Sequence, residues 1–401
     1  MYSNLMNLAA SIKEQLISYR RYLHANAEVG FELHKTKAYV RTKLEEMGCT
    51  VDDCGKCGIV ATIGGKQSGS VFLLRADMDA LPIREESDEV FSSQSGAMHA
   101  CGHDMHTAML LGAAQLLKLH ENEIEGKVKL MFQPAEEIFE GSYDMIQAGV
   151  LDHPKVDAAM MIHVTPGVPF PIGTAIVSSP GVSAPAADYF TIRVQGEGCH
   201  GSAPQAGIDA LTAAAHILIA LQEIQARELG MGDYTVLTIG QFHGGTASNA
   251  IADSATLGGT IRTFDEKIRE FVKQRIQDIS SGVAGAFRAT AEVSFDSGCP
   301  SLLNDQNVSE SVKHYLNELL GHVFTSTELN PTGKPAAGGS EDFAYISREV
   351  PSVMIALAAG EPQKGYTHPV HHPKVTFDED VLPIGSAIYA YCALRYLSEN
   401  K

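Results

Sequence analysis

Apolar and polar residues follow two different spacings in the first part of the chain. Helical spacing of the apolar positions predicts helices over residues 12–24 and 36–47. Short, nearly continuous apolar runs predict strands over residues 59–63, 71–74 and 128–132. Helices that alternate with strands in this way favour an α/β fold, in which a mixed sheet is flanked by helices.

The pattern changes near residue 184. Residues 178–185 are mostly small residues and prolines, as in a hinge. Beyond them we predict a strand, a helix, two strands, a helix and a strand, over residues 189–194, 208–225, 235–242, 254–263, 266–287 and 289–294. This β-α-β-β-α-β order is typical of a ferredoxin-like sheet. We therefore expect a smaller α+β domain over residues 184–296, inserted into a larger domain of residues 1–183 and 297–401.

Composition narrows the class of protein. Apolar residues make up 44% of the 401 residues, which is enough for a folded interior, and no stretch approaches the ~20 apolar residues of a membrane span. The net charge of −18, without a compensating cluster of Lys and Arg, argues against binding to nucleic acid or to an anionic membrane. Seven cysteines without regular spacing favour a reducing compartment, and the start of the chain lacks the pattern of a signal peptide. We expect a cytoplasmic protein.

The first candidate for chemistry is the pair Cys101 and His103. A thiolate and an imidazole two positions apart can bind one metal ion, and zinc and its neighbours favour mixed sulfur and nitrogen ligands. A helical pattern over residues 107–119 follows the pair. The motif alone is weak, because a buried cysteine usually serves as a small apolar residue.

Two adjacent carboxylates, Glu136 and Glu137, follow the predicted strand over residues 128–132. An arbitrary pair of glutamates usually belongs to a solvated surface, but a position just beyond a buried strand and Pro134 favours a site. Neighbouring side chains point in different directions, so one glutamate can bind a metal ion while the other acts as a general base. This division suits a metal-dependent hydrolase.

Two further stretches supply histidines. His163 ends the apolar run over residues 158–163, and His371 and His372 precede Pro373. A lone histidine at a strand end is more often structural than a ligand. Metal-type donors in four distant stretches are harder to dismiss, because an open α/β sheet gathers such residues at the carboxyl ends of its strands.

Together these motifs make the chain resemble the M20-type metallo-amidohydrolases, in particular the N-acyl-amino-acid deacylases. That subgroup includes hippurate hydrolases, N-acetyl-diaminopimelate deacetylases and plant auxin-conjugate hydrolases. The matching segments follow the family's order along nearly the whole chain; they are residues 75–82, 98–106, 133–137, 163, 244–249, 259–262, 339–343 and 371–373. The resemblance implies cleavage of the amide bond of an N-acetyl or N-aroyl L-amino acid. It also implies that the inserted domain serves as a lid and joins copies into a homodimer or a higher homo-oligomer.

The resemblance assigns the metal ligands. Two divalent ions, of a kind (Zn, Mn, Co or Ni) that the donors do not distinguish, would be held by Cys101, His103, Glu137, His163 and His371. We prefer His371 to His372, because the family's ligand stands two residues before the proline.

Other roles also follow from the resemblance. Glu136 would be the general base towards a metal-activated water, and His200 would stabilise the oxyanion from the partner subunit. Asn249 and Arg262 would hold the carboxylate of the substrate, for which the planar fork of an arginine is well suited. Asp77 and Asp79 would orient the ligand histidines by accepting from their free ring N–H groups. His106 either has a similar supporting role or is a histidine packed in the core.

Three alternatives stay open. A dipeptidase or carboxypeptidase of the same family would need the same carboxylate-binding residues but a different acyl pocket. A metal-stabilised binding protein without turnover belongs to another class, and the intact pair of Glu136 and Glu137 argues against it. An amidase with Cys101 as its nucleophile would lose activity on thiol alkylation but not on chelation.

The chain departs from the family pattern at Gln205, where many relatives have histidine. This position is not one of the expected metal ligands.

Overall fold

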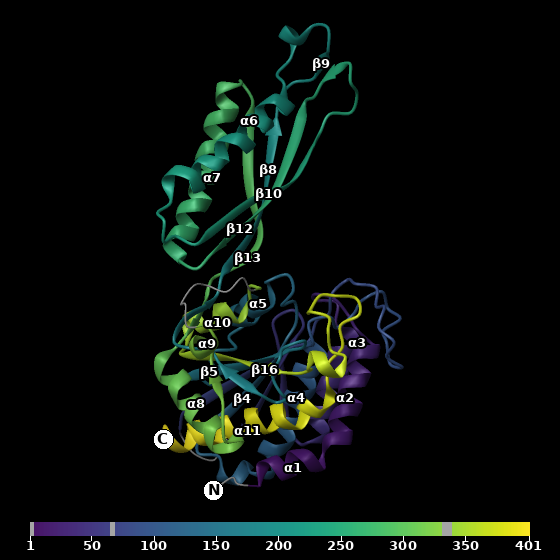
Figure 1. Cartoon of the computed structure of the whole chain (residues 1–401), viewed down its shortest axis with the longest axis vertical. Helices are drawn as coiled ribbons and strands as arrows, with labels where there is room; N and C mark the ends of the chain where they lie inside the picture. The colour runs from purple at the N-terminus through teal and green to yellow at the C-terminus, as the bar shows by residue number, and fades with distance from the viewer. Residues whose placement is uncertain (1–3, 65–68, 331–338) are drawn as a thin grey trace. The chain divides into compact units, whose positions relative to one another are not determined.

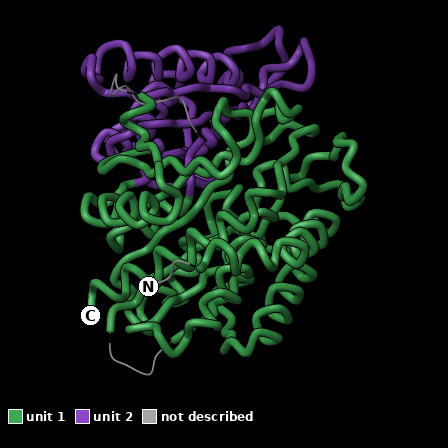
Figure 2. The backbone as a smooth tube through the Cα atoms, turned by 60° about the horizontal axis from the view of Figure 1, so that its bottom comes forward, with its two compact units in different colours: residues 1–183, 303–334, 342–401 green, residues 184–302, 335–341 purple. Residues whose placement is uncertain are grey.

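The computed structural model describes residues 4–64, 69–330 and 339–401. The chain forms two compact units, each with its own hydrophobic core (Figure 2). The first consists of residues 1–183, 303–334 and 342–401, and the second of residues 184–302 and 335–341. Two short strands, β7 (Gly181–Ala184) and β14 (Leu302–Asn304), pair with each other where the chain passes between the units.

An eight-stranded sheet forms the centre of the first unit (Figure 1). Its strands, in order across the sheet, are β1 (Thr50–Cys54), β2 (Gly58–Gly64), β4 (Lys127–Gln133), β3 (Val71–Asp77), β5 (Ala158–Thr165), β16 (Ser352–Ala358), β6 (Ala175–Val177) and β15 (Phe324–Thr325). Strands β4, β3, β5 and β16 run parallel to one another, whereas β2 and β6 pair antiparallel with their neighbours β4 and β16. This mixed sheet confirms the predicted fold class.

Helices surround this sheet. They are α1 (Leu5–Ser11), α2 (Lys13–Ala25), α3 (His34–Glu46), α4 (His103–Leu119), α5 (Gly141–Gln147), α8 (Gln306–Leu320), α9 (Ser326–Leu329), α10 (Phe343–Glu349) and α11 (Leu382–Glu399). Helix α4 is almost wholly buried because it packs against both the sheet and α11. A Cβ atom at Gly112 of α4 would lie 2.3 Å from Ser386 Oγ of α11, so the two helices can approach this closely only with glycine there.

The second unit has the predicted order of elements. Four antiparallel strands lie in the order β10 (Thr235–Gly244), β12 (Ser254–Thr263), β8 (Ala186–Gln195) and β13 (Thr290–Cys299). Helices α6 (Ala210–Glu223) and α7 (Glu266–Ala286) complete the ferredoxin-like arrangement, and a short ladder of β9 (Cys199–His200) and β11 (Ala250–Ile251) is added. The boundary expected after residue 296 falls inside β13, because this strand continues past a bulge and pairs with β8 as far as Cys299.

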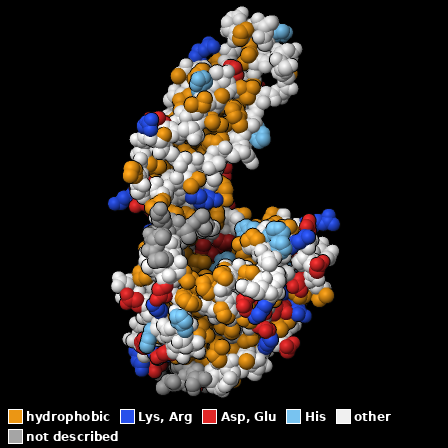
Figure 3. Space-filling view, in the orientation of Figure 1, with side chains coloured by type: hydrophobic (Ala, Val, Ile, Leu, Met, Phe, Trp, Pro, Cys, Tyr) orange, Lys and Arg blue, Asp and Glu red, His pale blue; other side chains and the backbone are white. Residues whose placement is uncertain are grey.

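The second unit also leaves apolar side chains in contact with solvent. Tyr189, Val236 and Phe242, on strands β8 and β10, are each at least 39% exposed. In Figure 3, apolar side chains form interrupted patches along the visible face of the second unit, and the first unit shows apolar areas with acidic and basic side chains around them. In the described part of the chain, no helix combines the length and apolar character that crossing a membrane would require.

Candidate active site

Three parallel strands end at the same edge of the large sheet and bring candidate residues together. Strand β3 ends at Asp77, β4 ends at Gln133, and His163 lies near the end of β5. Glu136 and Glu137 follow β4 within a few residues. Because the carboxyl ends of neighbouring parallel strands share one edge, residues far apart in the sequence meet there.

The loop that enters α4 supplies a thiol and an imidazole. The helix begins at His103, not at Thr107 as the apolar pattern indicated. Gly102, at its N-cap, has a φ of 84°, and a Cβ there would lie 2.5 Å from Val164 Cγ2. Only glycine fits this left-handed, closely packed turn, which places Cys101 and His103 against β5.

The five predicted metal ligands converge. Ligand atoms of Cys101, His103 and His163 lie within 4.8 Å of one another, and the same holds for Cys101, Glu137 and His371. Cys101 belongs to both groups, so the two positions adjoin. The Nε2 atom of His371 lies 3.6 Å from Glu137 Oε2, which agrees with the preference for His371 over His372.

Hydrogen bonds fix which ring nitrogen of each histidine faces the cluster. His103 Nδ1 lies 2.8 Å from the carbonyl oxygen of Asp79, and His163 Nδ1 lies 2.8 Å from that of Val164. A carbonyl oxygen only accepts, so both Nδ1 atoms carry the proton. In the neutral ring of His163, Nε2 therefore presents a lone pair, which is the form that binds a metal. His103 presents the same lone pair once its ring has lost its second proton.

Two buried atoms in the cluster have no hydrogen-bond partner among the described residues. They are His103 Nε2 and Glu137 Oε1, which lie 3.8 Å apart. Buried polar atoms are rarely left unpaired, because the loss of hydration is unfavourable. A divalent cation bound by these donors would supply the missing partner, so the residues fit a metal centre.

Burial shifts the ionisation of the candidate ligands. It raises the pKa of the Cys101 thiol above its ordinary range and raises the pKa of Glu137 to about 7. Burial lowers the pKa of His163 to about 3, which keeps that ring neutral. For His103, burial alone would lower the pKa, but Asp77 and the bond to Asp79 raise it well above the ordinary value. A bound cation would displace these protons, since metal ligands must be deprotonated.

The expectation that Asp77 and Asp79 orient ligand histidines agrees with the contacts of Asp79 and needs correction for Asp77. The carboxylate of Asp77 accepts a hydrogen bond at 2.6 Å from His106, whose other nitrogen accepts the N–H of Val164 at 2.9 Å. Asp79 does orient His103: its backbone carbonyl accepts from Nδ1, as described above, and its Oδ1 lies 3.5 Å from the same nitrogen. Its carboxylate also accepts the backbone N–H groups of Glu136 and Glu137, at 3.0 and 3.2 Å. The side chain of Asp79 thus holds the two glutamates.

Glu136 is held from two sides. Its backbone is fixed by Asp79, and its Oε1 accepts the N–H of Asp342 at 3.3 Å. Its Oε2 lies 4.0 Å from His103 Nε2, and Glu136, Glu137 and His103 form a further group of mutually close donors. A carboxylate in this position borders the ligand cluster, as the assignment as general base requires.

Backbone strain concentrates around the cluster. Four described residues other than glycine have a positive φ, and three of them are Ala135 (56°), Phe139 (58°) and His371 (66°). Side chains disfavour this region of backbone space, and such residues persist where the surrounding structure enforces them, commonly at functional sites.

A set of buried residues received no role from the sequence. Arg75, Gln133, Ser142 and Asp342 form a hydrogen-bonded network beside the cluster. Arg75 and Asp342 lie in motifs that carry the family resemblance, but only the fold brings them together. An arginine inside an otherwise apolar run was the one available signal, because a buried charge needs a partner.

The remaining candidates lie in the second unit, where Asn249 and Arg262 are far apart. His200 is exposed, with Nδ1 accepting from Ser202 Oγ at 2.8 Å, and the carbonyl of Asn249 accepts the N–H of Gly201. Arg262, near the other end of β12, donates to Tyr189 Oη at 3.0 Å and lies over its ring. At about 3.3 Å per residue, β12 separates the two ends by roughly 25 Å. One copy of this unit therefore does not bring Asn249 and Arg262 to the same carboxylate.

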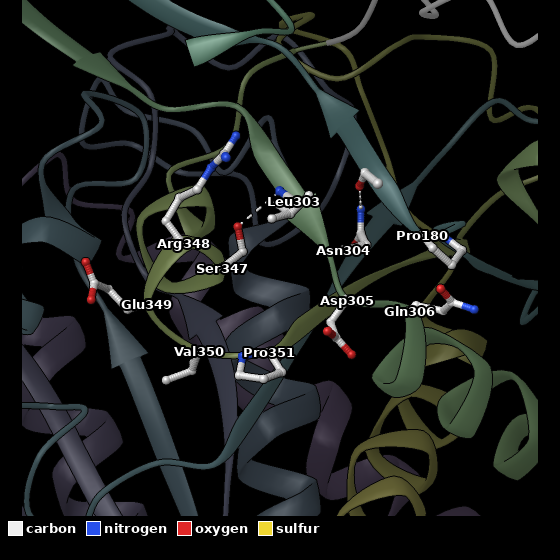
Figure 4. A pocket seen from close by; sticks show the side chains of 11 residues that line it. Pro180, Leu303, Asn304, Asp305, Gln306, Ser347, Arg348, Glu349, Val350 and Pro351 are labelled. Carbon is white, nitrogen blue, oxygen red and sulfur yellow. Dashed lines mark hydrogen bonds between the residues drawn. The ribbon is translucent and has the colours of Figure 1, made fainter. Parts of the chain in front are cut away.

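The first unit also has a separate pocket of about 560 Å³, beside α8 and α10 (Figure 4). The residues around it include Asn304, Asp305, Ser347 and Arg348, and none of the predicted site residues is among them. Ser347 Oγ accepts the N–H of Leu303, whereas the charged side chains point in different directions in Figure 4. This arrangement suggests no common ligand.

Comparison with known proteins gives a consistent result. The model of peptidase family M20/M25/M40 matches residues 73–395. The N-acetyl-L-cysteine deacetylase of Bacillus subtilis is 35% identical, over 100% of this chain and 92% of its own. Thermostable carboxypeptidase 2 of Saccharolobus solfataricus is 36% identical over 99% of both chains. Among solved structures, the Bacillus subtilis YXEP protein, a dinuclear metal binding peptidase from the M20 family, has a TM-score of 0.78 and 32% identity over 97% of this chain and 99% of its own.

Proposed function

This chain belongs to peptidase family M20/M25/M40 and is a hydrolase, and we propose that it removes the acyl group from N-acyl L-amino acids in a metal-dependent reaction. The observation that carries the proposal is the convergence of Cys101, His103, Glu137, His163 and His371 beside a further carboxylate, Glu136. A relative named as a deacetylase and sharing 35% identity over the whole chain supports the acyl substrate.

We propose that the cluster holds two divalent cations. The two ligand groups that share Cys101 support this number, as does the similarity to a dinuclear metal binding peptidase. When bound, the cations would lower the pKa of a water molecule and polarise the carbonyl of the scissile amide. The donor set, one thiolate with histidines and a carboxylate, suits zinc and neighbouring transition metals.

The residues of the chain then have separate tasks. Glu136 would accept a proton from the attacking water and return it to the departing amine, which conserves the proton over the reaction. Asp79 and the N–H of Asp342 hold Glu136 for this exchange. Arg262 would bind the substrate carboxylate through its guanidinium, and His200 would donate to the oxyanion.

We propose that two copies of the chain assemble through the second unit. Asn249 precedes the start of β12, whereas Arg262 lies near its end, so one small substrate needs them from different copies if both contact it. The exposed apolar side chains of β8 and β10 support burial of this unit in an interface. For the location of the protein we propose the cytoplasm, because all seven cysteines are free thiols in the structure.

A carboxypeptidase activity is the second candidate, because a named carboxypeptidase is 36% identical over nearly the whole chain. Both activities need a free carboxylate on the substrate and differ in the group on the other side of the amide. Acyl amino acids and dipeptides of the same C-terminal residue therefore separate them.

The experiment compares N-acetyl, N-benzoyl and dipeptide substrates on one enzyme preparation. Hydrolysis should stop on dialysis against a chelator and return when Mn or Zn is added; activity that survives chelation but not thiol alkylation would instead point to Cys101 as a nucleophile. Arg262→Ala should raise KM for free acids and leave KM for the matching methyl esters nearly unchanged. Equal cleavage of acids and esters by the parent enzyme would contradict the role of Arg262.

A further inference from the structure

Arg75 is a fully buried arginine near the end of the central strand β3. Its side chain has no exposed surface, and a buried guanidinium is strongly unfavourable unless it is paired. Three of its nitrogens donate to three side chains. Nε lies 2.8 Å from Gln133 Oε1, Nη1 lies 2.6 Å from Asp77 Oδ2, and Nη2 lies 2.8 Å from Asp342 Oδ1.

The contact with Asp77 concerns the metal cluster. Asp77 belongs, with His103 and His106, to a group of donors close enough to hold one cation. Its Oδ1 is engaged by His106, and its Oδ2, which lies 3.6 Å from His103 Nε2, is engaged by Arg75. A carboxylate oxygen next to a divalent cation is a good ligand unless another positive group occupies it. The guanidinium of Arg75 is the positive group that occupies this oxygen.

The contacts with Asp342 and Gln133 concern the general base. The carboxylate of Asp342 accepts from the side-chain amide of Gln133 at 2.7 and 2.8 Å and from the backbone N–H of Ser142 at 2.9 Å. The backbone N–H of Asp342 donates to Glu136 Oε1. Gln133 is also the last residue of β4, the strand that leads to Glu136. A shift of Asp342 or Gln133 would therefore move the base.

We propose that Arg75 is a positioning residue that keeps the carboxylate of Asp77 out of the metal coordination sphere and, through Asp342, fixes Glu136. The two tasks depend on one planar group with donors in three directions. A lysine would retain the charge but could not reach three acceptors in fixed directions. This inference rests on the proposed metal-dependent function.

Cobalt is a suitable probe, because its visible spectrum reports the number and type of ligands without any turnover. In Arg75→Met the freed Asp77 oxygen becomes a ligand, and the absorbance per bound cobalt should fall as the coordination number rises. In the double variant Arg75→Met/Asp77→Asn, the amide is a poor ligand, so the spectrum should return towards that of the parent. This double variant also removes one positive and one negative buried charge together.

Arg75→Lys is a second variant, which keeps the test possible if Arg75→Met does not fold. We expect it to fold, to lower kcat at least tenfold with little change in KM, and to bind cobalt 10- to 100-fold more weakly, as changes beside metal ligands commonly do. Arg269→Met is the matched control, because Arg269 also pairs with a buried aspartate, Asp188, but in the second unit. It should leave the cobalt spectrum unchanged.

The outcomes are distinct. A parent-like cobalt spectrum in both Arg75→Met and Arg75→Lys would overturn the inference, and so would a spectrum that the added Asp77→Asn change does not restore. A parent enzyme that binds no cobalt would contradict the proposed function itself, before any variant is made.

Discussion

Replacing Glu137 with glutamine should stabilise the cation-free protein, although it removes a predicted metal ligand. The reason is the buried carboxyl group, whose pKa burial raises to about 7 from an ordinary value of 4.5. The unfolded chain ionises this group near pH 4.5, whereas the folded chain keeps it protonated until about pH 7. The free energy of unfolding therefore falls as the pH rises between these two values, and above pH 7 the destabilisation by this group is constant.

The size of the effect follows from the same shift. A difference of about 2.5 pKa units corresponds to about 3 kcal/mol at 1.36 kcal/mol per unit. This net shift already includes the attraction of the charged His103, which offsets part of the cost of burial. Glutamine is neutral and nearly the same shape. We expect the metal-free Glu137→Gln protein to gain about 1–3 kcal/mol at pH 8 and almost nothing at pH 4.5.

Urea unfolding of chelator-treated protein, followed by far-UV circular dichroism, measures this gain; the chain has no tryptophan to report by fluorescence. Glu140→Gln is the control, because the side chain of Glu140, in the same loop, is 46% exposed. Adding a divalent cation at pH 8 should reverse the order, since only the parent has the carboxylate ligand. Equal stabilisation at pH 4.5 and pH 8, or none at either, would refute the assignment of the effect to a buried charge.

Three further changes test other parts of the structure. Glu136→Gln should lower kcat by about 10²–10⁴-fold while the bound metal, measured by elemental analysis, stays near the parent value; loss of metal would mean that the two glutamates have exchanged roles. Gly141→Ala should lower both melting temperature and kcat, because its Cβ would lie 1.6 Å from the carbonyl oxygen of Pro134 and must displace the loop of Glu136; parent-like values would show that this loop yields. Arg269→Met should destabilise the protein by about 3–5 kcal/mol in urea, because buried Asp188 loses its bidentate partner, whereas a loss below 1 kcal/mol would show that water reaches it.

Amphipathic elements were the part of the fold most readable from sequence. The strand predicted over residues 254–263 matches β12, and the helix predicted over residues 266–287 matches α7 to within one residue. In both, one face packs on a core and the other meets solvent, so the apolar spacing shows the element directly. The order of elements in the second unit, and hence its ferredoxin-like topology, followed from such segments.

Prediction failed where buried residues are polar. The strand expected over residues 71–74 continues through Arg75 to Asp77, and every residue of it is buried. Helix α4 starts at His103 and not at Thr107. Its first turn contains the polar residues His103, Asp104 and His106, which are buried like the apolar residues that follow. Charged and imidazole side chains break an apolar pattern even when their charges are neutralised by partners distant in sequence. Those partners, such as Asp342 for Arg75, are identified only by the fold.

The buried polar residues that interrupt the apolar pattern are also the residues that identify the candidate site. Cys101, Glu137 and His103 hold protons that burial or neighbouring charges force on them, and two of their atoms lack partners. Three neighbouring residues have strained backbones. None of these features stabilises the chain alone, so packing gives no reason for them. A bound cation would pair the unpaired atoms and take the place of the protons on Cys101, Glu137 and His103. Because those protons compete with the cation, metal binding should release protons and weaken as the pH falls.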